Sequence, residues 1–219
     1  AIGVRLFERD KRRGLTTRAG EEIVARAKRL LMEADDLMGA ARRYVDPLSG
    51  TLRVGVIPTI SPYLVPSATG ALRARFASLV VRWVEDKTPV LVEELEAGRL
   101  DAVLLALEAP LGPMDHAVIG IDPFVLAGSS AHPLLRSQKP IELGALEGFE
   151  VLLLDEGHCL REQALELCAT SSANEAAFRA TSLSTLATMV ADGKSLTLLP
   201  SLAVPVEAGR AGLSTRVFA

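Results

Sequence analysis

The sequence predicts an α/β fold in which one long helix is followed by two small lobes. Three observations predict it. Apolar residues recur at three- and four-residue steps along an early stretch, which is the spacing of one helix face. After a break at Asp46-Pro47-Leu48-Ser49-Gly50, short apolar runs alternate with helical patterns, as in strand–helix–strand units. The same alternation then begins again, which predicts a second unit.

The early helix is expected to run from about Thr17 to Tyr44. Its apolar stripe is too long for a helix that only closes a small core, and it suits a helix packed on its twin in a dimer. An amphipathic helix lying on its own domain is the alternative. The stripe consists of Ile23, Val24, Ala27, Leu30, Leu31, Ala34, Leu37 and Met38.

The first lobe is expected to alternate strands and helices. Strands are predicted at 52–57, 80–85 and 101–107, and the last is almost continuously apolar, as a sheet covered on both faces requires. Helices are predicted at 61–76 and 88–97, opened by Ser61-Pro62 and Thr88-Pro89. This order predicts a parallel sheet with right-handed crossovers.

The second lobe is expected to have strands near 124–126, 150–154, 176–179 and 195–199, and helices near 159–169 and 182–191. Two such lobes enclose a cleft. Ligands of open α/β folds bind beyond the carboxyl ends of the strands, so the cleft is the expected binding site.

Composition limits the class of protein. The 219 residues carry a net charge of -3, which argues against wholesale binding to polyanions. The basic residues are concentrated at the start, where residues 1–44 hold 11 Lys and Arg against 7 Asp and Glu. No apolar run is long enough for a membrane span and no signal-peptide pattern is present, so a soluble, cytoplasmic protein is expected.

The two cysteines, Cys159 and Cys168, are nine positions apart in a helix-forming run. On an intact helix this spacing puts the sulfurs on opposite faces and about 13.5 Å apart along the axis. A disulfide requires Cα atoms within about 7 Å. If the two thiols bond, the helix must unwind, and the pair would then act as a switch.

Cys159 has reason to be reactive, because it is expected at a helix N-terminus, where the dipole favours thiolate. His158 and Arg161 are expected to add positive potential. A partly exposed thiolate with a second thiol in reach suits peroxide chemistry, in which a sulfenic acid forms and is resolved to a disulfide. Two inert, buried cysteines are the alternative. No metal or cofactor is expected, since a zinc site would lack a fourth ligand and a close cysteine pair.

Hydroxyl side chains stand where the cleft is expected. Thr59 follows the first predicted strand and Thr88 the second, each just before a helix. Both can cap their helices, or they can bind a small polar ligand together with free backbone N–H groups. Thr181-Ser182 offers the same choice, and there we expect a cap.

These motifs resemble the LysR-type regulators, and within them the OxyR branch, whose members sense hydrogen peroxide. Leu6-Phe7-Glu8-Arg9 with Leu15-Thr16-Thr17-Arg18-Ala19-Gly20 resembles the wing of a winged helix-turn-helix leading into a linker helix. Gly157-His158-Cys159-Leu160-Arg161, with the second cysteine nine residues later, is the most specific match. The resemblance also covers Ile57-Pro58-Thr59, Phe178-Arg179-Ala180-Thr181-Ser182-Leu183 and Leu198-Leu199-Pro200.

The resemblance implies a two-lobed, periplasmic-binding-protein-like regulatory domain behind a linker helix. It implies that residues 1–18 are the remnant of the winged helix-turn-helix, 19–46 the dimerisation helix, 51–122 lobe I and 123–219 lobe II. The family pattern extends further at both ends, so we expect a truncated chain. The remaining DNA contacts are expected from a basic cluster, for which a solvated turn is the alternative. The cluster consists of Arg9, Lys11, Arg12 and Arg13.

The resemblance further implies that Cys159 reacts with peroxide, that Cys168 resolves it, and that Thr59, Thr88, His158 and Arg161 surround the reactive thiol. Expected partners are hydrogen peroxide, promoter DNA, RNA polymerase, further copies in a homodimer or homotetramer, and a reductant such as glutaredoxin or thioredoxin. The predicted function is a peroxide-sensing transcriptional activator and not an enzyme. The alternatives are a LysR-type regulator binding a small anionic effector in the cleft, and a thiol peroxidase or cysteine hydrolase.

Overall fold

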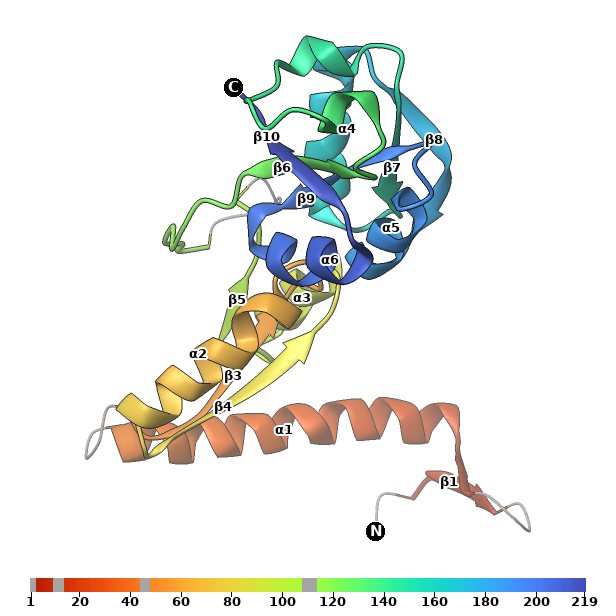
Figure 1. Cartoon of the computed structure of the whole chain (residues 1–219). Helices are drawn as coiled ribbons and strands as arrows, with labels where there is room; N and C mark the ends of the chain where they lie inside the picture. Colours follow the sequence, from red (N-terminus) through yellow and green to blue (C-terminus); the bar gives the residue numbers. More distant parts are fainter. Residues whose placement is uncertain (1–2, 10–13, 44–47, 108–113) are drawn as a thin grey trace. The chain divides into compact units, whose positions relative to one another are not determined.

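The computed structural model describes residues 3–9, 14–43, 48–107 and 114–219. The chain forms two compact units, residues 1–51 with 76–80, and residues 52–75 with 81–219 (Figure 1). Every residue predicted for the cleft belongs to the second unit.

The first unit contains a hairpin and a long helix. Strands β1 (Phe7–Arg9) and β2 (Gly14–Thr16) pair antiparallel, and α1 (Arg18–Arg43) follows, which confirms the predicted helix. Thr17 Oγ1 accepts a hydrogen bond from Gly20 N at 3.0 Å, and so caps the first turn. A Cβ on Gly20 would lie 2.0 Å from the carbonyl oxygen of Leu6, so only glycine fits there. Part of the apolar stripe is exposed, including Leu30, Leu31, Leu37 and Met38.

A three-stranded sheet is built from the first predicted strand–helix group. Its strands are β3 (Gly50–Val56), β4 (Leu79–Glu85) and β5 (Ala102–Leu104), in the order β4-β3-β5, and its helices are α2 (Ser61–Arg75) and α3 (Thr88–Glu96). β3 and β5 are parallel, as predicted. β5 is shorter than the predicted strand 101–107, because only Ala102, Val103 and Leu104 find partners on β3.

The second predicted group forms a five-stranded mixed sheet in the order β10-β6-β9-β7-β8. Its strands are β6 (Phe124–Gly128), β7 (Glu150–Leu154), β8 (Asn174–Ala180), β9 (Leu196–Pro200) and β10 (Ser214–Val217). β7 runs parallel to β8 and β9, whereas β6 runs antiparallel to β9 and β10. The helices are α4 (Cys159–Ser171), α5 (Leu183–Val190) and α6 (Val204–Ala211), with short 3-10 turns η1 (Pro133–Leu135), η2 (Leu143–Leu146) and η3 (Ser201–Ala203).

Apolar residues cover both faces of this sheet. On β7, Leu152 and Leu154 face a cluster with α5 and α6, while Val151 and Leu153 face a cluster with α4 and η2. Figure 1 shows α4 on one side of the strands and α5 and α6 on the other. The helix N-cap expected at Thr181-Ser182 is confirmed, since Ser182 Oγ accepts from Thr185 N at 3.2 Å.

No helix within the described part of the chain is long and apolar enough to cross a membrane.

Candidate functional site

Four of the predicted site residues meet at one small hollow, here called the Cys159 hollow. It encloses about 150 Å³ of empty space, part of it open to solvent. Its walls come from the segment after β3, the start of α3 and the turn before α4, which all follow the carboxyl ends of strands. The lining residues are Ile57, Pro58, Thr59, Lys87, Thr88, Gly157, His158 and Cys159.

Two buried polar atoms of this hollow have no hydrogen-bond partner among the described residues. They are Thr88 Oγ1 and His158 Nε2, and their side chains are only 6% and 5% exposed. Buried polar atoms are almost always paired, because an unpaired one costs about 1–3 kcal/mol. The hydroxyl and the ring nitrogen therefore suit a small ligand that both donates and accepts hydrogen bonds. The hollow is too narrow for a water-sized molecule in this conformation, so a ligand enters only with a shift of the lining side chains.

The capping role considered for Thr88 is wrong. The N-cap of α3 is Lys87, and Thr88 is the first helical residue; its side chain lines the hollow and its hydroxyl bonds to no backbone N–H of the described residues. Thr59 also lines the hollow and is 5% exposed.

Cys159 is the first residue of α4, as the sequence predicted, but the expectation of partial exposure is wrong. Its side chain is 7% exposed and packs with Ile57, Leu91 and Leu100. His158 is the N-cap and makes no side-chain cap bond, so the thiol lies at the uncapped, positive end of the helix dipole.

His158 does not supply the positive charge expected of it. Burial lowers the pKa of its imidazole, the Lys87 ammonium lowers it further, and Asp155 only partly opposes them, so the ring is neutral near pH 7. The positive charge at the hollow belongs to Lys87, which the sequence analysis did not single out. Lys87 Nζ donates to the carbonyl oxygen of Glu156 at 2.6 Å. The only hint in the sequence was its position directly before Thr88.

Arg161 is predicted to flank the thiol, and the structure places its guanidinium elsewhere. The side chain is buried and donates to Leu154 O at 2.9 Å, and it pairs with Glu175 at 2.8 Å. Arg179 bridges the same Glu175 to Glu156, at 3.3 Å and 3.4 Å. Arg161 does not line the Cys159 hollow. It ties the first turn of α4 to β7 and β8 instead.

Cys168 lies on the same helix, in a different apolar cluster. It packs with Leu126, Val151 and Ala164, whereas Cys159 packs against the residues that follow β3 and against α3. Burial and the nearby Glu175 carboxylate raise the pKa of the Cys168 thiol. Both cysteines are free thiols. The opposite faces predicted from helical geometry are therefore confirmed by two separate packing environments.

The predicted DNA contacts fall mostly outside the described residues. Arg9 ends β1, and Lys11, Arg12 and Arg13 lie beyond the described part. Among the described residues, no three His, Cys, Asp or Glu side chains gather as a metal site would require.

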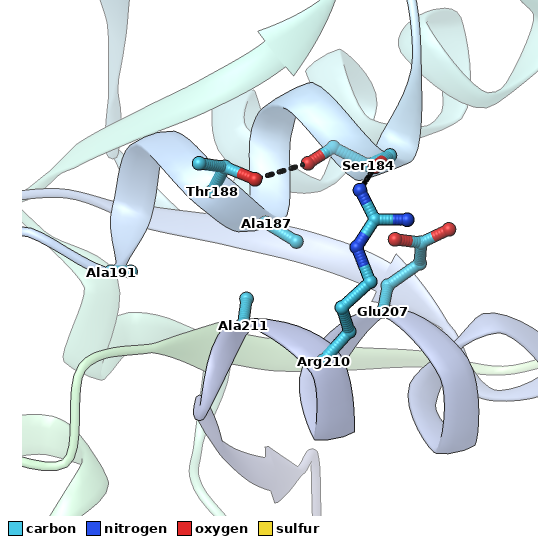
Figure 2. A pocket seen from close by; sticks show the side chains of 7 residues that line it. All are labelled: Ser184, Ala187, Thr188, Ala191, Glu207, Arg210 and Ala211. Atoms are coloured by element: carbon cyan, nitrogen blue, oxygen red, sulfur yellow. Dashed lines mark hydrogen bonds between the residues drawn. The ribbon is translucent and has the colours of Figure 1, made fainter.

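A larger hollow of about 380 Å³ lies between α5 and α6, and it contains none of the predicted site residues. Figure 2 shows Arg210 of α6 reaching Ser184 of α5, which it contacts at 2.9 Å. Glu207, on the same wall, accepts from the Tyr63 hydroxyl at 2.8 Å. The polar groups here bond to each other, in contrast to the unpaired atoms beside Cys159.

Comparisons with known proteins agree with this arrangement. Residues 46–219 match the model of the LysR substrate binding domain. The chain is 40% identical, over its whole length and 70% of the relative, to a probable hydrogen peroxide-inducible genes activator of Mycobacterium leprae. It is 39% identical to the DNA-binding transcriptional dual regulator OxyR of Escherichia coli K12, over 97% of the chain and 70% of that protein.

Among solved structures, a Corynebacterium glutamicum OxyR variant with a cysteine replaced by serine and hydrogen peroxide bound has a TM-score of 0.78 and 35% identity. The match covers 99% of this chain and 68% of that one. On the family match and these identities, the chain belongs to the LysR family and, within it, to the OxyR branch.

Proposed function

We propose that this protein is a hydrogen-peroxide-sensing transcriptional activator in which Cys159 is oxidised first and Cys168 resolves it. The observation that carries the proposal is that the Cys159 thiol shares one hollow with the unpaired Thr88 Oγ1 and His158 Nε2. Hydrogen peroxide has two O–H donors and two acceptor oxygens, which match a hydroxyl and a neutral imidazole. The names of the relatives, hydrogen peroxide-inducible genes activators, support the same function.

The chemistry proceeds in two steps. The Cys159 thiolate attacks one oxygen of the peroxide, the O–O bond breaks, and hydroxide leaves and is protonated to water, so that a sulfenic acid remains. The Cys168 thiolate then attacks the sulfur of the Cys159 sulfenic acid. The disulfide bond forms, the S–O bond breaks, and a second hydroxide leaves. Peroxide is the oxidant, and the two thiols supply both electrons.

The second step requires a conformational change. Nine residues of intact α4 separate the thiols by about 13.5 Å along the axis, while a disulfide needs Cα atoms within about 7 Å. We propose that the segment between the cysteines unwinds and that the change passes to the DNA-binding part. In this proposal 1–18 is the end of a winged helix-turn-helix, 19–46 the dimerisation helix, and 51–122 and 123–219 the two lobes.

The partners we propose are promoter DNA, touched by the cluster Arg9, Lys11, Arg12 and Arg13, and further copies of the chain in a homodimer or homotetramer. RNA polymerase would be contacted at the promoter, and glutaredoxin or thioredoxin would reduce the disulfide. We propose signalling rather than turnover. His132, the other buried histidine of the described part, packs edge-on against Phe149, and its Nδ1 accepts from Leu134 N, so this nitrogen is not free to take a proton from a thiol.

The test is anaerobic titration of the reduced protein with hydrogen peroxide, followed by mass spectrometry of the peptides that carry Cys159 and Cys168. We expect both thiols to be lost at near-stoichiometric peroxide with one intramolecular disulfide formed. In Cys168→Ser the oxidation should stop at the Cys159 sulfenic acid, and in Cys159→Ser neither product should form. Thiols that survive a large excess of peroxide would refute the function.

A further inference from the structure

Lys87 spans the Cys159 hollow between two segments that are distant in sequence. Its backbone caps α3, and its side chain reaches the turn before α4, where Nζ donates to Glu156 O at 2.6 Å. A Cβ built on Gly157 would lie 3.0 Å from the Lys87 Cδ, so the aliphatic part of the side chain lies over the glycine. The lysine therefore contacts the turn both through its stem and through its ammonium.

We propose that Lys87 is a positioning residue for the oxidation of Cys159: it clamps the turn before α4 and places positive charge beside the thiol. The proposal rests on the proposed peroxide chemistry. It adds a residue that does not react itself but sets how fast Cys159 reacts.

The clamp acts on the backbone that aims the thiol. Gly157 has φ +83°, a conformation open chiefly to glycine, and two residues separate the clamped carbonyl from Cys159. Apart from the exposed Arg179–Glu156 pair, this turn has little side-chain support of its own, since His158 makes no cap bond. A charge-assisted hydrogen bond is about twice as strong as a neutral one, so the ammonium fixes the position of the turn more firmly than a neutral donor would.

The charge acts on the chemistry. Negative charge is carried by the attacking sulfur and then by the departing hydroxide, and a preorganised cation at the hollow stabilises both. The electrostatic field of the Lys87 ammonium extends into the hollow, because it lowers the pKa of the His158 imidazole. Asp86, Asp155 and Glu156 are the acidic neighbours of the clamp. Each of them would weaken this positive field; Arg179 pairs with the Glu156 carboxylate, and Lys87 is the cation that lines the hollow itself.

The experiment uses the full chain in a Cys168→Ser background, so that only the first step is measured. The rate of Cys159 sulfenic acid formation is followed with a trapping reagent in Lys87→Met, Lys87→Gln and Lys87→Arg. Lys194→Met is the matched control, because Lys194 is an exposed lysine that does not line the hollow. We expect the Met and Gln variants to react about tenfold more slowly, the order expected for one lost charge-assisted hydrogen bond. The Arg variant should remain within about threefold, as expected where a donor of the same charge is kept.

A second readout separates positioning from general damage. The time profile of Cys159 alkylation by iodoacetamide at one fixed pH needs no peroxide, and alkylation should be slower in Lys87→Met and Lys87→Gln but not in Lys87→Arg or Lys194→Met. Equal oxidation rates and superimposable alkylation profiles would overturn the role of Lys87. If the unsubstituted protein fails to react with peroxide, the proposed function falls, and the alkylation profiles still decide on the clamp.

Discussion

Arg161→Met is predicted to make the Cys159–Cys168 disulfide harder to reduce. In the reduced protein the Arg161 guanidinium, 7% exposed, donates to Leu154 O and pairs with Glu175. Arg161 lies between the two cysteines, in the segment that must unwind before a disulfide can form. The ion pair and the bond to Leu154 therefore stabilise the reduced state, and we expect both to be lost in the disulfide state.

The magnitude follows from these contacts. Removing one partner of a fully buried ion pair costs about 3–5 kcal/mol. The Glu175 side chain is 27% exposed, so water relieves part of the penalty and a cost of about 2–3 kcal/mol in the reduced state is expected. For a two-electron couple about 1.4 kcal/mol corresponds to 30 mV, so the reduction potential should become more negative by about 40–65 mV.

The assay is equilibration of the protein in glutathione or dithiothreitol redox buffers, with the thiol and disulfide forms counted after acid quench and alkylation. The matched control is Arg179→Met, which removes a more exposed arginine from the same Glu175. An exposed pair contributes at most about 1 kcal/mol, so its potential should move by less than about 20 mV. An unchanged potential for Arg161→Met, together with a loss of stability in the reduced form, would refute the reasoning, because the pair would then persist in the disulfide form.

Two further predictions concern stability. Ser182→Ala should lower the free energy of unfolding by about 1 kcal/mol, since it removes the cap on Thr185 N. Urea titration measures the loss, with Thr181→Ala, a change at the exposed neighbouring residue, as the control. Equal urea midpoints for the two variants would contradict the prediction. Lowering the pH from 7 to 5 should destabilise the reduced protein, because burial lowers the pKa of His132 and His158. The stability that these two histidines contribute is fully present above about pH 6.5, which is the pKa of histidine in an unfolded chain. It is lost as the pH falls through the lower pKa values that the two side chains have in the folded protein. The loss should shrink in a His132→Gln, His158→Gln double variant, and an undiminished loss would assign it to other groups.

Much of the fold follows from the order of apolar runs. The strands and helices from β3 to β9, and the long helix α1, were predicted to within a few residues, because their apolar residues recur at strand or helix spacing and turn residues separate them. α6 and β10 were not predicted. They are short, Pro205 interrupts the apolar pattern at the start of α6, and β10 reads Ser-Thr-Arg-Val, with few apolar residues.

The site was predicted in part. The carboxyl ends of strands are a geometric consequence of the fold, so Thr59, Thr88 and Cys159 converge as expected. Side-chain direction is not encoded in such a pattern. Arg161 follows Cys159 by two residues, yet its buried partners are on β7 and β8, and the charge at the hollow comes from Lys87, 72 positions before Cys159. Only packing in three dimensions decides which of the two cations lines the hollow that contains the thiol.

The two packing environments of the cysteines impose an order on the switch. While α4 is intact, Cys168 is buried beside Glu175 and its raised pKa keeps it a protonated thiol, which is a poor nucleophile. Cys159, in a separate cluster and beside the unpaired atoms of its hollow, is the thiol that we propose reacts with peroxide. The disulfide cannot form until at least one sulfur leaves its apolar cluster, and a closely packed cluster opens cooperatively rather than gradually. In the proposed switch, oxidation of Cys159 precedes unwinding, and unwinding exposes Cys168 and lets it ionise. The proposed reduced and disulfide states are then two discrete packings of the segment from Cys159 to Cys168, which is the property a regulator needs in order to give an all-or-none response to its oxidant.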